Sequence, residues 1–193
     1  TSKIVAPDDI SFNSFVGSDW KLTGTIWFKP YNLGVKRTLI SKTDGASERA
    51  FEFYIDTDDI LALNLSDLDG TNQVTYKATT SVAEDTWQFA AFTYDGYIDA
   101  YKIYLDGSNN NASLSSSVGT FASMSACTSD LIIGAVDDVT IATFFDGYID
   151  EVRVTNRVLS DEEIAANYEL GDGTYYWKVV ADDGLTKYQA TSE

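Results

Sequence analysis

The chain has 193 residues but no histidine, one cysteine, one methionine and two prolines. Without histidine there is no imidazole base, no Ser-His-Asp or Cys-His catalytic machinery and no imidazole zinc site. Cys127 has no cysteine partner for an internal disulfide, and we interpret it as a small packing residue. No apolar run approaches the roughly 18 residues that a membrane span requires, so membrane insertion is not expected.

Basic residues are also scarce, and acidic residues dominate the charge. The 30 Asp and Glu residues outnumber the 13 Lys and Arg residues, which gives a formal net charge of −17. A surface of this charge repels a phosphate backbone, so nucleic acid is excluded as an expected partner. Seven Asp-Gly pairs punctuate the chain, and such pairs are typical of hairpin turns. Solvated acidic loops are the simpler explanation of the charge, and cation binding is the alternative.

Short strand-like segments separated by turn signals recur along most of the chain. Residues 51–55 alternate in the two-residue pattern of a strand, and residues 61–65 are predicted to form the return strand. The Ser- and Asn-rich segment 109–129 is predicted to be a loop, and only residues 161–169 are predicted to be helical. This pattern predicts an all-β fold of two antiparallel sheets.

One segment predicts a strand and a capped helix in immediate succession. Two-residue alternation places Tyr148, Asp150, Val152 and Val154 on one face of the strand. A carboxylate that shares a face with two valines needs a hydrogen-bond donor or a metal ion. We therefore predict that Asp150 is largely buried.

The helix that follows carries two start signals. Ser160 and Glu163 have the spacing of a capping box, and Leu159 with Ile164 can form a hydrophobic staple around it.

Residues 147–154 and 159–164 together resemble the closing strand and terminal helix of laminin G-like, or concanavalin A-like, jelly rolls. Segments 24–30, 39–42, 87–96 and 103–107 resemble earlier strands of the same family, in the family's order. The resemblance covers residues 1–170 and implies an antiparallel two-sheet jelly-roll sandwich with one short C-terminal helix. Residues 171–193 resemble the end of a fibronectin type III-like or Ig-like repeat. They are predicted to form a C-terminal hairpin, either docked on the sandwich or leading to a neighbouring module.

The resemblance also implies a calcium site. Relatives of the laminarinase type place a calcium ion against an aspartate of the closing strand, and Asp150 matches that position. We expect Asp8 and Asp9 to be its co-ligands, because calcium takes carboxylate and carbonyl oxygens. The alternative for Asp150 is a hydrogen bond to the backbone or to a neighbouring arginine.

Other residues are candidates for ligand binding at the rim of the sandwich. Asp137 and Asp138 are predicted to contact a ligand, directly or through a second ion, and Tyr31 is a candidate for stacking on a sugar ring. The acidic turn at residues 56–59 is a further candidate for this ion. A solvated turn is the simpler interpretation of residues 56–59 and also of Asp137 and Asp138.

The expected function is recognition without catalysis. Laminarinase-type glycosidases carry a Glu-x-Asp-x-x-Glu strand, and no glutamate in this chain has an aspartate two positions later. We predict a non-catalytic module of a larger extracellular or surface protein, with a glycan or surface protein as partner, binding carbohydrate with calcium as a structural or bridging ion. The alternative is a structural or adhesion domain of a virion decoration, tail fibre or bacterial adhesin that makes protein contacts. A glycoside hydrolase is the least favoured class.

Overall fold

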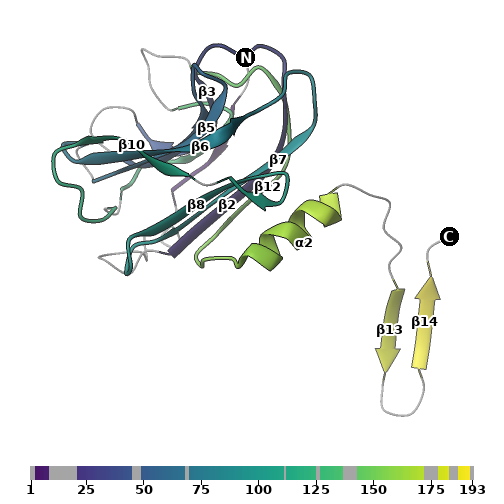
Figure 1. The fold of residues 1–193 in the computed structure, drawn as a ribbon. Coiled ribbons are helices and arrows are strands. Elements are labelled where there is room, and N and C mark those ends of the chain that lie inside the picture. The colour runs from purple at the N-terminus through teal and green to yellow at the C-terminus, as the bar shows by residue number, and fades with distance from the viewer. Residues whose placement is uncertain are drawn as a thin grey trace.

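The computed structural model describes residues 3–8, 21–44, 49–67, 70–110, 112–124, 127–136, 143–171, 178–182 and 187–191. Within these ranges, strands form two antiparallel sheets packed face to face, with a helix against the outer face of one sheet (Figure 1). The predicted all-β, two-sheet jelly roll with one short C-terminal helix is confirmed.

The larger sheet contains seven strands from the described residues. Their order is β1 (Ile4–Ala6), β11 (Leu131–Ile133), β3 (Arg37–Thr43), β4 (Arg49–Ile55), β5 (Ile60–Ser66), β6 (Gln73–Ser81) and β10 (Ser113–Val118). The other sheet has five described strands. Their order is β12 (Gly147–Thr155), β2 (Lys21–Pro30), β7 (Gln88–Asp95), β8 (Ala100–Leu105) and β9 (Ser108–Asn109).

The main core lies between the sheets. Ile26 and Phe28 of β2 and Phe92 of β7 are fully buried there against Phe53 of β4. Gly24 permits close contact at one end of this core, because a Cβ at this position would overlap the Phe92 ring. The alternate residues of β2 and β7 face outward, and several of them are also buried, because a helix covers them.

The helix α2 (Asp161–Gly171) packs on the outer face of the five-stranded sheet through a second apolar cluster. Leu159 and Ile164 contribute to this cluster from the helix side, together with Phe89 and Tyr104 from the sheet. The predicted staple pair therefore shares one buried cluster, because both residues point at the same patch of sheet.

The capping box that starts α2 is also confirmed. The backbone N–H of Glu163 donates to Ser160 Oγ (3.2 Å), and the N–H of Ser160 donates to the Glu163 carboxylate (2.9 Å). These two bonds satisfy N–H groups that the first turn of a helix leaves without partners.

A β-bulge in β12 changes which residues face the core. The pairing with β2 shifts between Asp150 and Arg153, and Glu151 adopts a positive φ of 47°. As a result Val152 packs against the core while Asp150 points outward. The prediction that Asp150 shares a face with two valines and is buried is therefore wrong, because an extra residue in one strand interrupts the two-residue alternation.

The edge strand β10 and the C-terminal hairpin are two further elements on which the sequence made a prediction. The predicted loop at 109–129 contains the exposed edge strand β10, so that prediction is wrong in part. The C-terminal hairpin forms, with β13 (Lys178–Asp182) paired to β14 (Lys187–Thr191) in a sheet of its own. Whether it docks on the sandwich or belongs to a neighbouring module stays a prediction.

The close packing around Gly147, the first residue of β12, can be tested by substitution. Its φ is +149°, and a Cβ there would overlap the backbone carbonyl oxygen of Lys29. We expect Gly147→Ala to lower the free energy of unfolding by about 1–3 kcal/mol or more, measured by denaturant unfolding. Gly34→Ala is the matched control, because Gly34 also has a positive φ (79°) but open space around it. An equal decrease in the free energy of unfolding for the two variants would contradict the expected overlap with Lys29.

A truncated chain tests the position of the hairpin. If the hairpin packs on the sandwich, ending the chain at Gly171 lowers the free energy of unfolding by several kcal/mol, about what burying a few large side chains contributes. If it contacts another module or chain, stability is unchanged and self-association or partner binding is lost instead. Thermal melting and light scattering of the two lengths of chain separate these outcomes, and no change in either measurement contradicts both.

Candidate functional site

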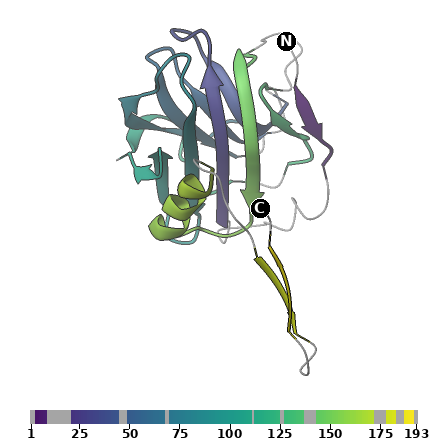
Figure 2. The same cartoon turned by 90° about the vertical axis from the view of Figure 1, so that its right-hand side faces the viewer.

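A groove lies on the outer face of the five-stranded sheet, between α2 and the edge strand β12. In Figure 2 the helix covers one part of this face and leaves the C-terminal end of β2 and the start of β12 uncovered. Three adjoining hollows of about 300, 250 and 250 Å³ make up the groove. The first two share Thr25, Arg153 and Asn167, and the last two share Trp27 and Asp150.

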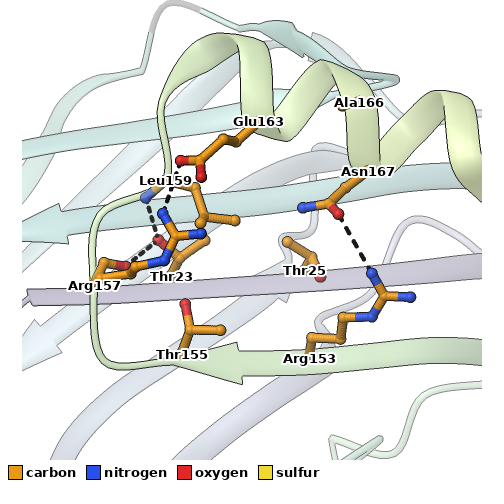
Figure 3. Close-up of a pocket in the computed structure, with 9 residues that line it drawn as sticks. All are labelled: Thr23, Thr25, Arg153, Thr155, Arg157, Leu159, Glu163, Ala166 and Asn167. Carbon is orange, nitrogen blue, oxygen red and sulfur yellow. Dashed lines mark hydrogen bonds and ion pairs between the residues drawn. The ribbon is translucent and has the colours of Figure 1, made fainter. Parts of the chain in front are cut away.

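The first hollow is lined mainly by threonine, arginine, glutamate and asparagine residues and lies beside the N-terminal half of α2 (Figure 3). Arg153 extends from β12 and donates to Asn167 of α2 (3.3 Å) and to Glu151 (2.7 Å). At the other end, Arg157 donates to the Glu163 carboxylate (2.8 Å). Each arginine is thus held by an acidic neighbour, which fixes the position of its guanidinium group.

Thr23 fastens this end of the groove to the sheet. Its hydroxyl donates to the carbonyl of Arg157 (2.7 Å) and accepts from the N–H of Leu159 (3.0 Å). The segment that joins β12 to α2 is therefore attached to β2.

Trp27 forms the floor of the middle of the groove. Its ring stacks on Tyr168 of α2 (centroids 5.6 Å apart, planes at 17°) and also contacts Phe89. Gly171 ends the helix against this indole, and a Cβ at that position would overlap the Trp27 ring. A glycine at residue 171 therefore lets the helix end lie directly on the groove floor.

An exposed group of three aromatic residues, which we call the aromatic cluster, lies at the uncovered end of the groove. Tyr31, Trp87 and Tyr148 are 39%, 45% and 56% exposed. The rings of Trp87 and Tyr148 stack (6.3 Å, 22°), and Tyr31 meets Tyr148 edge-on (5.4 Å). The side-chain hydrogen bond to Tyr148, together with nearby carboxylates, raises the pKa of Tyr31 to about 12. Exposed rings that support one another in this way form a preorganised apolar surface.

Polar side chains border the aromatic cluster. Lys29, opposite Tyr148 in the sheet, forms an ion pair with Asp85 (2.9 Å). Asn32 donates to the Asp146 carboxylate beside Tyr31. A sugar ring needs this combination, because its C–H face is apolar and its hydroxyls require donors and acceptors.

The predicted site residues are only partly brought together. Tyr31 lies in the aromatic cluster, and Asp150 lies beside it as an exposed wall of the groove. The Asp150 carboxylate accepts a hydrogen bond from the N–H of Glu151 (2.8 Å), which is the backbone alternative foreseen from the sequence. Sequence reasoning missed Trp87 and Tyr148, because their proximity depends on the order of strands across the sheet.

The expected calcium ligands do not assemble among the described residues. Asp8 lies by the larger sheet, where its carboxylate pairs with the buried amine of Lys42 (2.6 Å). Asp9, Asp137 and Asp138 fall outside the described residues. Within the described ranges, no three His, Cys, Asp or Glu side chains are placed to hold a metal ion. Calcium binding therefore stays a prediction that the described donors do not support.

The acidic turn at residues 56–59 is occupied by an ion-pair network. Lys77 forms ion pairs with Asp56 and with Asp58 (2.9 Å). The hydrogen bond from Lys77 helps to hold the pKa of Asp56 below its usual value, against the opposing effect of burial. These carboxylates already have a cationic partner, in keeping with the simpler interpretation of this turn.

The fold and this face define a lectin-like β-sandwich with an aromatic cluster at the end of a polar groove. The chain belongs to the Concanavalin A-like lectin/glucanases superfamily, whose Laminin_G_3 family matches residues 5–165. The predicted family is therefore confirmed. No curated protein sequence is significantly similar to the chain.

Solved structures share the fold at low sequence identity. One is the CBM40 module of the Ruminococcus gnavus IT-sialidase bound to α2,3-sialyllactose, with a TM-score of 0.62 and 21% identity over 78% of this chain and 84% of that one. The binding domain of botulinum neurotoxin serotype G has a TM-score of 0.62 and 15% identity, over 88% of this chain and 40% of that one. A SAP-like pentraxin from Limulus polyphemus has a TM-score of 0.54 and 16% identity, over 76% and 69%.

The hydrogen bonds of Glu163 at the start of α2 can be tested through the pH dependence of stability. The hydrogen bond from Arg157, followed by that from the Ser160 backbone, lowers the pKa of Glu163 to about 2. Because the folded pKa lies below the ordinary value, the stabilisation is present above about pH 4.5 and is lost as the pH falls towards 2. We expect Glu163→Gln to melt below the parent at pH 6 and the difference to shrink between pH 4.5 and 2.

Glu84→Gln is the control, because it removes the same charge from the surface away from α2. Its melting difference from the parent should stay nearly constant over that range. A Glu163→Gln difference that does not change with pH would contradict the proposed bond.

Proposed function

We propose that this chain is a non-catalytic carbohydrate-binding module of an extracellular or surface protein. The observation that carries the proposal is the aromatic cluster, Tyr31, Trp87 and Tyr148, exposed at the end of a polar groove. The shared fold with a CBM40 module bound to sialyllactose supports the same class of function. Among the described residues, no helix is long and apolar enough to cross a membrane.

The chemistry of the groove supports binding rather than hydrolysis. A glycosidase needs a carboxylic acid that is protonated near neutral pH to donate to the leaving oxygen. Glu163 has a pKa of about 2, so this carboxylate is charged near neutral pH, and Glu151 forms an ion pair with Arg153 (2.7 Å). Such side chains suit acceptance of hydrogen bonds from sugar hydroxyls.

A glycan array tests the proposal. We expect the parent chain to bind a defined set of glycans and Trp87→Ala/Tyr148→Ala to lose about tenfold or more in affinity, because stacking surface is removed. Tyr97→Ala is the control, since Tyr97 is an even more exposed aromatic residue (73%) but lies in the turn between β7 and β8. Unchanged binding by the double variant would contradict the cluster as the site, and no binding by the parent would contradict the function.

The same array and a thermal melt, each run with calcium and with a chelator, test the predicted ion. Weaker glycan binding or a lower melting temperature on chelation supports a structural or bridging calcium. Identical results in the two buffers contradict the calcium prediction and leave the glycan proposal in place.

A protein-contact role is a second candidate, favoured by the edge strand β10. All six residues of β10 are exposed, including Leu114 and Val118, and its partner strand β6 covers only one side. An uncharged edge strand can pair with a strand from another chain. Concentration-dependent association that Ser116→Pro abolishes would support this role, and a monomer at all concentrations would oppose it.

A further inference from the structure

We propose that the groove takes a linear, uncharged oligosaccharide that lies along β12, with one sugar ring on the aromatic cluster. This inference rests on the proposed function and names the class of glycan and the way it lies. Three observations carry it: the length of the groove, the distribution of charge along it, and the hydrogen-bonding groups in its walls.

The length of the groove suits a chain of sugar rings rather than a single ring. The strand β12 runs from Tyr148 in the aromatic cluster, past Asp150 and Arg153 in the middle hollow, to Thr155 in the first hollow. Seven steps along a strand span about 23 Å at roughly 3.3 Å per residue. The three hollows adjoin through shared residues, so one extended ligand that passes over the Arg153–Asn167 hydrogen bond can reach all of them.

The charges along the groove favour an uncharged ligand. Each cation of the described lining and border has an acidic partner: Lys29 has Asp85 (2.9 Å), Arg153 has Glu151 (2.7 Å) and Arg157 has Glu163 (2.8 Å). Asp150 and Asp146 add negative charge beside the aromatic cluster. A carboxylate-bearing sugar would therefore meet excess negative charge on a molecule whose net charge is already −17.

The walls still offer donors and acceptors to neutral hydroxyls. The Asp150 carboxylate is exposed and accepts one backbone hydrogen bond, which leaves further acceptor capacity. Arg153 is exposed and Asn167 half-buried, and the two face each other across the groove (Figure 3). A hydroxyl can donate to the first group and accept from the others, whereas a carboxylate can only accept.

The experiment measures affinity against chain length by isothermal titration calorimetry. The probes are β-1,4-linked glucose, mannose and xylose oligomers of one to six units, with 3′-sialyllactose and oligogalacturonates as the charged comparison. Two variants separate the ends of the groove. Trp87→Ala removes stacking at the cluster, and Ala166→Trp fills the first hollow from the exposed face of α2.

We expect affinity in one neutral series to rise with length, and the charged probes to bind at least about tenfold more weakly. Trp87→Ala should weaken all lengths, whereas Ala166→Trp should weaken the longest oligomers about tenfold and leave the short ones unchanged. Circular dichroism verifies that both variants fold.

Affinity that is independent of length, stronger binding of a charged probe, or an Ala166→Trp variant identical to the parent would each overturn the inference. Glycan binding that survives both variants would overturn it while leaving the proposed function intact. Absence of binding to every probe here and on the glycan array would overturn both.

Discussion

The arrangement of this molecule depends on a sheet that is apolar on both of its faces. In β7, Phe92 faces the core between the sheets while Phe89 and Ala91 face the helix. Because each large buried side chain contributes about 1.5–3 kcal/mol, the outer cluster is strong enough to hold α2 on the sheet. The helix then forms one wall, β12 forms the other, and Trp27 lies between them as the floor. The groove is thus a result of packing outside the main core.

Much of the fold could be predicted from local patterns. Turn signals and apolar segments located most strands, and Ser160 with Glu163 marked the start of the helix, because these features depend on neighbours in sequence. The face of Asp150 could not be predicted, since the bulge at Glu151 interrupts the alternation on which the prediction relied. The strand β10 was missed because an exposed edge strand rich in serine has no apolar alternation to reveal it.

The candidate site was predicted only in part. Tyr31 was predicted as a candidate for stacking on a sugar ring, and it lies in the aromatic cluster. Its neighbours Trp87 and Tyr148 come from segments about 60 residues apart. Trp87 immediately precedes β7 and Tyr148 lies in β12, and these two strands flank β2 on opposite sides. Such a cluster depends on strand order and register, which a single sequence indicates only weakly. The groove likewise required knowing where α2 packs.

The bulge in β12 divides the strand between two tasks. Ile149, Val152 and Val154 serve the core, whereas Asp150 and Arg153 project from the surface. Replacements at the projecting positions can accumulate without disturbing the interior, so selection can act on recognition and on folding separately. One strand of this kind can diversify into many specificities on a constant scaffold. The same division makes β12 a natural place to randomise in a designed binding library.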